Sequence, residues 1–298
     1  MARRHPDWLK VRIGTGDTYA HIKTMLRDAN LHTICEEAKC PNIAECFGSG
    51  TAVFLILGDV CTRHCAYCSV RHGTPRPLAP RESEEVAASV QKLGLSYVVI
   101  TSVTRDDLPD GGATVFADTI HAIRRINPNC AIEVLIPDFH GNASSVATVV
   151  NAKPEVVNHN IEVVQALFPS IRPGGDYTRS LTLLKLVKTY NPRLTTKSGL
   201  MVGLGETEDQ IQQTFRDLRA AHVDFLTIGQ YLQPTKQHEP IHRYYTPAEF
   251  DNLRAQALAE GFRHVESGPL VRSSYHASTA FMTAHPPEHR ANREGYIQ

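Results

Sequence analysis

An alternation of short apolar runs with longer amphipathic stretches constrains the fold of this 298-residue chain most strongly. From residue 51 onward, runs rich in β-branched residues alternate with stretches whose apolar residues recur at helical spacing. The pattern predicts strands at 52–57, 97–102, 131–136, 156–160, 199–204 and 224–229, and helices at 82–94, 113–127, 143–152, 178–190, 207–221 and 247–260. Serial βα units favour a parallel sheet with right-handed crossovers. We therefore predict an α/β fold, a partial (β/α)6 TIM-type barrel or a strongly curved open sheet.

The two ends of the chain do not continue this repeat. We expect an N-terminal extension at 1–50, the barrel at 51–261, and a C-terminal extension at 262–298 whose last stretch, HPPEHRANREGYIQ, is a mobile tail. Both extensions are expected to lie across the barrel. Functional residues should gather at the carboxyl ends of the strands, where the βα loops converge.

Charge and hydropathy argue against several classes of partner. The 31 basic residues balance 31 acidic ones, so no overall field favours nucleic acid or an anionic membrane. Apolar runs such as AVFLILG are far shorter than the roughly 20 residues that span a bilayer. The basic N-terminus MARRHPDWLKVR leads into no apolar signal segment, which leaves a short organellar transit piece as the lesser alternative. We predict a cytoplasmic protein without nucleic acid or membrane partners.

Six of the seven cysteines lie in two groups of three. They are Cys35, Cys40 and Cys46 in CEEAKCPNIAEC, and Cys61, Cys65 and Cys68 in CTRHCAYC. In a chain that is not secreted, such clusters indicate metal ligands or redox groups rather than disulfides. The seventh, Cys130, is expected to be a small residue without a catalytic role.

The second group favours an iron–sulfur cluster with one open iron. Its three cysteines fall on one short loop after the first predicted strand, and a [4Fe-4S] cluster then keeps one iron without a protein thiolate. Zinc, with His64 or His72 as the fourth ligand, is the alternative. Zinc ligands, however, usually come as two pairs from separate knuckles.

The loop CTRHCAYC resembles the CxxxCxxC loop of the radical S-adenosylmethionine (SAM) enzymes, which carry it after the first strand of a partial (β/α)6 barrel. In that superfamily the open iron chelates SAM, and an electron from the cluster cleaves SAM to a 5′-deoxyadenosyl radical. The upstream triplet, spaced CxxxxCxxxxxC, resembles the lipoyl synthase family in particular. Further matching stretches are TSVTRDDLPDGGA, EVLIPDFHG, NHNIE, RPGGDY, KSGLMVGLGET, GQYLQPT and RSSYHA, so the resemblance extends from about residue 10 to residue 280.

This resemblance implies that two sulfur atoms are inserted at C6 and C8 of an octanoyl chain carried on the N6 atom of a protein lysine. It also implies two [4Fe-4S] clusters. The loop cysteines would hold the cluster that cleaves SAM, and the upstream triplet would hold an auxiliary cluster that donates sulfur. A serine of RSSY would be its fourth ligand, and we favour Ser274 over Ser273. An alkoxide binds iron more weakly than a thiolate does, which suits a cluster consumed in turnover.

Polar and glycine residues at or near the strand ends are the candidate contacts to SAM: Tyr67, Thr101, Ser102, Glu133, Asn158, His159, Gly199 and Glu206. By resemblance, Thr101 and Ser102 meet the methionyl amine and Tyr67 lies by the adenine. GLMVGLGE, from Gly199 to Glu206, resembles the GxIxGxxE stretch of the superfamily.

For several of these residues a structural role is an equal alternative. Buried hydrogen bonding explains Glu133, Asn158 and His159 as well as a ligand contact does. The adjacent polar run at 105–107 forms either a solvated loop or part of the site for the substrate lysine.

The resemblance also implies the partners. They are octanoylated lipoyl carrier domains (2-oxoacid dehydrogenase E2 or glycine cleavage H protein), an electron donor such as ferredoxin or flavodoxin, and an iron–sulfur carrier for cluster repair. A monomer is expected, because a protein substrate must reach an open barrel mouth. Other radical SAM sulfur inserters, such as methylthiotransferases or biotin synthase, use different auxiliary ligand patterns. A metal-binding scaffold protein is the alternative from another class.

Overall fold

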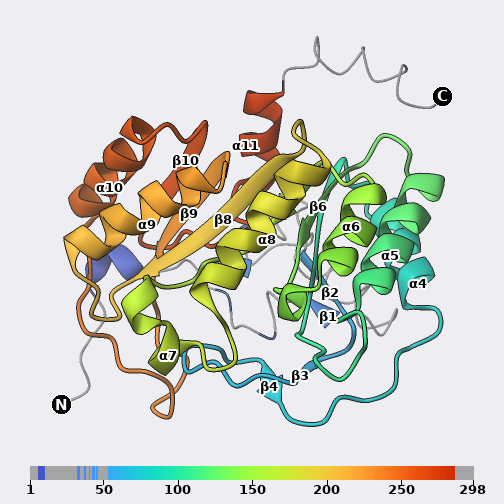
Figure 1. Ribbon diagram of the computed structural model, residues 1–298, viewed down its shortest axis with the longest axis horizontal. Coiled ribbons are helices and arrows are strands. Elements are labelled where there is room, and N and C mark those ends of the chain that lie inside the picture. The colour runs from blue at the N-terminus through green and yellow to red at the C-terminus, as the bar shows by residue number, and fades with distance from the viewer. Residues whose placement is uncertain are drawn as a thin grey trace.

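The computed structural model describes residues 6–10, 32–33, 37, 40, 42–43, 45 and 53–285. Within these residues, eight strands form one sheet in the order β1-β2-β5-β6-β7-β8-β9-β10. All neighbours from β2 to β10 pair in parallel, and only the two-residue β1 pairs antiparallel, with β2. The sheet curves strongly and carries its helices on the outer face (Figure 1). The predicted partial barrel is confirmed.

The strands are short, as buried parallel strands usually are. Their bounds are β1 His32–Thr33, β2 Val53–Ile56, β5 Tyr97–Ser102, β6 Ala131–Leu135, β7 Val156–Asn158, β8 Thr195–Val202, β9 Phe225–Gln230 and β10 His264–Gly268. A separate two-stranded sheet, β3 Val60–Cys61 with β4 Arg71–His72, frames the cysteine loop.

The helices follow the strands as the periodicity predicts. Their bounds are η1 Asp7–Leu9, α4 Glu82–Lys92, α5 Ala113–Ile126, η2 Phe139–Gly141, α6 Ala143–Asn151, η3 Gln165–Leu167, α7 Phe168–Ile171, α8 Tyr177–Tyr190, α9 Glu208–Ala220, α10 Pro247–Ala259 and α11 Ala277–Ala284. Local signals begin several of them: the side chain of Asp176 caps α8, and Thr207 forms a capping box at α9. No helix in the described part of the chain is both long and apolar enough to cross a bilayer.

Strand β10 is the main departure from the sequence-based expectation. The pattern predicts that the chain leaves the repeat near residue 262, and this is wrong for 264–268, because β10 pairs in parallel with β9 from His264 opposite Phe225 to Gly268 opposite Gly229. Only Val265 of this strand is fully buried. Because most residues of this strand are polar, local hydrophobicity does not predict it.

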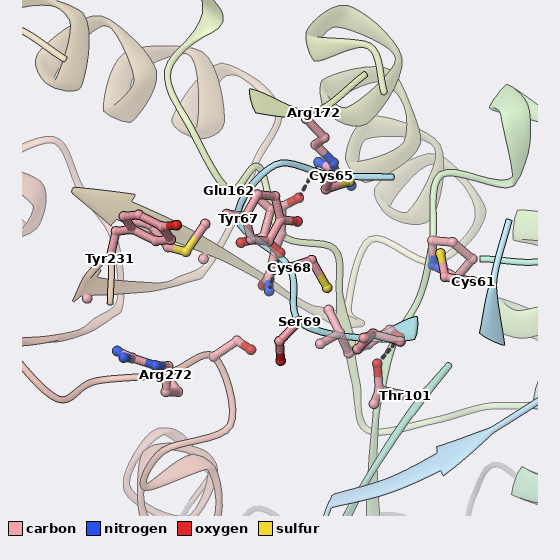
Figure 2. A pocket seen from close by; sticks show the side chains of 18 of the residues that line it. Cys61, Cys65, Tyr67, Cys68, Ser69, Thr101, Glu162, Arg172, Tyr231 and Arg272 are labelled. Carbon is pink, nitrogen blue, oxygen red and sulfur yellow. Dashed lines mark hydrogen bonds between the residues drawn. The ribbon is translucent and has the colours of Figure 1, made fainter. Parts of the chain in front are cut away.

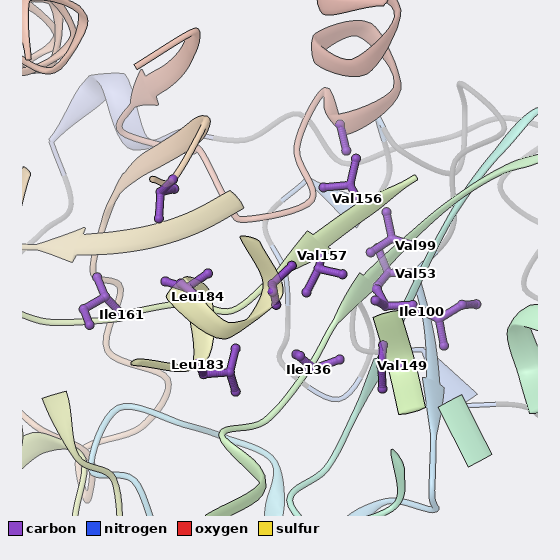
Figure 3. Close-up of a cluster of buried hydrophobic side chains, with 14 of the residues drawn as sticks. Val53, Val99, Ile100, Ile136, Val149, Val156, Val157, Ile161, Leu183 and Leu184 are labelled. Carbon is purple, nitrogen blue, oxygen red and sulfur yellow. The ribbon is translucent and has the colours of Figure 1, made fainter. Parts of the chain in front are cut away.

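The apolar core lies between the sheet and the outer helices. Strand residues such as Ile100 and Val157 lie in one apolar cluster with Val149 of α6 and with Leu183 and Leu184 of α8 (Figure 3). All four residues of β2 are buried, as expected for a parallel strand covered on both faces. This packing fixes the strand ends and therefore the loops that follow them.

Helix α11 lies at the end of the barrel opposite to β3 and β4 (Figure 1). Its Phe281 packs on Tyr97 of β5, with ring centroids 5.6 Å apart, and both side chains are buried. The hydroxyl of Tyr97 donates to Glu133, which also forms an ion pair at 3.0 Å with Lys197. We call this set of buried polar residues, with Asn158, the barrel floor.

Candidate active site

A cavity of about 480 Å³ opens at the carboxyl ends of the strands. Its lining includes all three loop cysteines, Cys61, Cys65 and Cys68, together with residues from the ends of β5, β8 and β9 (Figure 2). The three thiols are free and partly buried. A parallel barrel is expected to place its functional residues at this end.

The cysteine loop is held by backbone hydrogen bonds. The N–H of Gly73 donates to the carbonyl of Cys61 at 3.0 Å, and the N–H of Cys68 donates to the carbonyl of Cys65 at 3.1 Å. A further bond joins the N–H of Ala66 to the carbonyl of Ile171 at 2.9 Å. From the opposite side, His238 Nε2 lies 3.0 Å from the carbonyl oxygen of Cys68. The loop therefore has one defined course before any metal is considered.

Three free thiols on one loop that line one cavity fit an iron–sulfur cluster with three protein thiolates. Burial raises the pKa of Cys65 to about 11, against the opposing charge of Arg172, and burial raises the pKa of Cys68 to about 12. The described residues contain no group of three His, Cys, Asp or Glu side chains arranged for a single metal ion. Both His64 and His72 are exposed.

Three buried polar atoms in the cavity wall have no hydrogen-bond partner among the described residues: Ser102 Oγ, His159 Nε2 and Asn160 Oδ1. The other ring nitrogen of His159 lies 2.8 Å from the carbonyl of Ile136. Burial lowers the pKa of His159 to about 4, so the ring is neutral and Nδ1–H donates to that carbonyl. Nε2 therefore presents a lone pair to the cavity. Buried polar atoms are normally paired, so this wall fits a polar ligand.

Charged side chains also reach the cavity. Glu162, Arg172 and Arg272 line it (Figure 2), and burial raises the pKa of Glu162 while Arg172 acts in the opposite direction. Arg172 donates to the carbonyl of Asn160 at 2.9 Å. Glu162 has a φ of 69°, an uncommon conformation for a residue with a side chain. Strain of this kind often occurs at ligand sites.

The structure divides the sequence-predicted SAM contacts into two groups. Tyr67, Thr101, Ser102, His159 and Gly199 line the cavity.

Three others are not among the residues that line the cavity. Glu133 and Asn158 belong to the barrel floor, where the Asn158 amide donates to Glu133 at 3.2 Å. Glu206 accepts hydrogen bonds from the N–H groups of Gly203 and Leu204, at 2.6 and 2.9 Å. For Glu133 and Asn158 these contacts match the structural alternative for buried polar groups.

Of the auxiliary triplet, only Cys40 falls in the described residues, because Cys35 and Cys46 lie outside them. Burial raises the pKa of Cys40, while the nearby charge of Arg272 acts in the opposite direction. The RSSY stretch therefore lies beside this cysteine. Ser273 lines the cavity, and Ser274 is not among the lining residues.

Two further contacts connect the N-terminal segment to the rest of the site. The Asn42 side chain donates to the carbonyl of Leu270 at 2.6 Å, and Ser69 Oγ donates to the carbonyl of Glu37 at 2.8 Å. Both bonds lie beside predicted cluster ligands. They bring the two cysteine-bearing segments to the same end of the barrel.

Sequence reasoning assigned no role to Arg63, Asn160, Glu162, Arg172 or Arg272. Four of these residues lie in the matching stretches CTRHC, NHNIE and RPGGDY, and the fifth begins RSSY. Their position after predicted strands was the sequence signal that could have identified them.

The run at 105–107 is not a solvated loop throughout. Arg105 is only 3% exposed, bonds both oxygens of Asp107 at 2.8 Å and donates to the carbonyl of Leu57. Its neighbour Asp106 pairs with Arg63. The run therefore fixes the loop after β5 to the end of β2.

Comparisons with known proteins agree with this geometry. Residues 55–218 match the Radical SAM superfamily, and residues 1–40 match the N-terminal domain of lipoyl synthase. Methylornithine synthase has a similar fold, with a TM-score of 0.54 at 12% identity over 85% of this chain and 83% of that chain. HydG, a maturase of the [FeFe]-hydrogenase, has a TM-score of 0.57 at 12% identity over 96% and 72%. Fold and site together define a radical SAM enzyme.

Closer relatives give the particular family. Lipoyl synthase of Rubrobacter xylanophilus is 56% identical over 272 residues, 91% of this chain and 85% of that protein. Lipoyl synthase of Halalkalibacterium halodurans is 55% identical over 275 residues, 92% and 91% respectively. The chain belongs to the lipoyl synthase family of radical SAM enzymes.

Proposed function

We propose that this chain inserts two sulfur atoms at C6 and C8 of an octanoyl group carried on the lysine of a lipoyl carrier domain. The observation that carries the proposal is one cavity that brings together three loop thiols, unpartnered buried polar atoms, and Arg272 beside Cys40. In this site Cys61, Cys65 and Cys68 hold a [4Fe-4S] cluster. Cys35, Cys40 and Cys46, with Ser274, hold the auxiliary one.

The clusters and SAM, when bound, supply the hydrogen-abstracting radical and the sulfur. The protein's residues bind and orient. His159 Nε2 and Asn160 Oδ1 would accept hydrogen bonds from the cofactor, and Ser102 Oγ could donate one. Tyr67, which lies between Cys65 and Cys68 in the cysteine loop, would provide an aromatic face. Glu162, whose pKa is raised by burial and lowered by Arg172 and Arg272, would face a cationic cofactor bound in this cavity.

The contacts of the RSSY stretch leave two serines to compare. Ser273 faces the cavity, whereas the carbonyl of Ser274 accepts the N–H of Ala277 at the start of α11. We keep Ser274 as the proposed ligand. Ser274→Ala should then reduce the iron content of the auxiliary site, and Ser273→Ala should not. A reversed result would reassign the ligand to Ser273.

The proposal extends to partners and compartment. A ferredoxin or flavodoxin would deliver electrons and an iron–sulfur carrier would restore the auxiliary cluster, in a reducing compartment such as the cytoplasm. The enzyme would act as a monomer on octanoylated E2 or H-protein domains.

One experiment tests the function. The protein is reconstituted anaerobically, its iron and sulfide are counted, and it is incubated with SAM, reductant and an octanoyl-lysine peptide. We expect about eight irons, from two four-iron clusters, and a peptide mass gain from two sulfurs. Deoxyadenosine without sulfur transfer, or about four irons, would refute the assignment.

Three cysteine variants sharpen the result. Cys40→Ala should abolish sulfur insertion and keep some SAM cleavage, whereas Cys65→Ala should abolish both. The matched control is Cys130→Ala, because Cys130 is buried in the core and is not among the cavity-lining residues. It should retain both clusters and full sulfur insertion.

A further inference from the structure

Arg63, in the middle of the cysteine loop, is buried against two carboxylates. Its side chain is 7% exposed. Nε lies 2.7 Å from Asp106 Oδ2, and Nη2 lies 2.9 Å from Asp106 Oδ1 and 2.6 Å from Asp138 Oδ1. A guanidinium fork that engages a carboxylate at both oxygens fixes direction as well as distance. Lysine does not reproduce this geometry.

The two carboxylates belong to the loops after β5 and β6, and each has further partners besides Arg63. The N–H of Asp106 donates to Thr62 Oγ1 at 3.0 Å. Asp138 is fully buried and also accepts from Arg179 of α8 at 3.1 Å. Arg63 and the partly exposed Arg179 thus face two carboxylates, and His140 Nε2 also lies 2.8 Å from Asp106 Oδ1. Arg63 therefore ties the cysteine loop to both neighbouring βα loops, while its neighbour Thr62 adds bonds to the loop after β5 alone.

The same residue also contacts the predicted ligands. The backbone N–H of Arg63 donates to Cys61 Sγ at 3.4 Å. Arg63 is one of the charges that act on Cys65. Groups that orient ligands and donate to their sulfurs control cluster affinity and reduction potential.

We propose that Arg63 is a positioning residue that holds the loop from Cys61 to Cys68 in its cluster-binding conformation before metal arrives. Its guanidinium anchors the loop to Asp106 and Asp138, and this anchor fixes the N–H to sulfur contact at Cys61. The inference rests on the proposed function of the loop as the site of the SAM-cleaving cluster.

The first test uses the metal-free protein and hydrogen exchange. In Arg63→Gln, backbone amides of 61–73 should exchange roughly tenfold faster or more, because strong buried charge-assisted bonds are lost. Amides of β8 and β9 should be unchanged. The control is Arg71→Gln. It removes an arginine just after the loop whose side chain is 64% exposed and pairs with Asp59. Unchanged loop exchange in Arg63→Gln would overturn the proposal, and so would equally faster exchange throughout the barrel.

The second test measures the cluster itself. In a Cys40→Ala background only the loop cluster remains, so its iron content, reduction potential and electron paramagnetic resonance spectrum can be read without the auxiliary cluster. Arg63→Gln should lower iron retention and shift the potential, Arg63→Lys should be intermediate, and Arg71→Gln should match its parent. Identical retention and potential in all three would overturn the proposal.

The failure of the proposed function would look different. A parent protein that takes up no cluster and cleaves no SAM would refute the function of the loop. The exchange experiment on the metal-free chain would still report whether Arg63 anchors it.

Discussion

The ion pair in the barrel floor should dominate local stability. Lys197 and Glu133 are 2% and 1% exposed, and Lys197 Nζ lies 3.0 and 3.3 Å from the two carboxylate oxygens. Lys197→Met removes the cation and leaves a buried carboxylate whose remaining donors among the described residues are the Tyr97 hydroxyl and the Asn158 amide. Breaking a buried pair by removing one partner costs about 3–5 kcal/mol. At about 2–4 °C per kcal/mol, the midpoint should fall by roughly 10 °C.

The assay is urea and thermal unfolding of the metal-free protein, with a surface pair as the control. Arg125→Met removes the Arg125–Glu84 pair, whose side chains are 61% and 50% exposed, and should cost less than about 1 kcal/mol. Similar costs for Lys197→Met and Arg125→Met would refute the reasoning.

A double variant separates charge from packing. Lys197→Met with Glu133→Gln removes both charges, and the new amide can donate to Asn158 Oδ1, which has no partner among the described residues. Most of the lost stability should return, because a neutral replacement for a buried ion pair is often tolerated. The double variant should also keep SAM affinity. Lost SAM affinity in a stable double variant would place Glu133 back in the binding site.

Two further predictions follow from the cavity wall. Burial lowers the pKa of His159 to about 4, so the unfolded chain takes up a proton that the folded chain does not as pH falls from about 6.5 to 4. The free energy of unfolding should therefore decrease over this pH range by up to roughly 3 kcal/mol. His159→Gln should flatten this part of a stability–pH curve, and an unchanged slope would contradict the neutral assignment. In Gly229→Ala the new Cβ would collide with the carbonyl oxygen of Val271, so iron content at the auxiliary site should fall. The control is Gly268→Ala, whose Cβ would meet a Val271 methyl at 3.3 Å. Equal iron loss in both variants would argue against a collision with Val271 as the cause.

The six predicted βα units were accessible from the sequence because hydrophobic periodicity is a local signal. Val99 and Val157, for example, are buried in strands where the pattern predicts them. Strand β10 could not be predicted from the sequence, because it is a strand through its pairing with β9 and not through its own composition.

The site was predictable in part for a related reason. Residues that end strands, such as Ser102, and residues just after them, such as His159, line the cavity. Glu133 lies in the middle of β6, opposite Val99 and Val156, and its side chain belongs to the barrel floor. Local sequence gives the strand but not the depth of a side chain within the barrel. That depth depends on the register between strands.

The strand that sequence reasoning missed is also the one that places the RSSY stretch. Because β10 continues the sheet in register with β9, the chain emerges at Gly268 on the carboxyl edge, level with Gly229. The absence of a side chain at Gly229 lets the carbonyl of Val271 approach β9 closely. Arg272 is thereby brought to the cavity and to the neighbourhood of Cys40. A sulfur donor held there would face the same cavity as the loop thiols, which is the arrangement that sulfur transfer to a carbon radical requires.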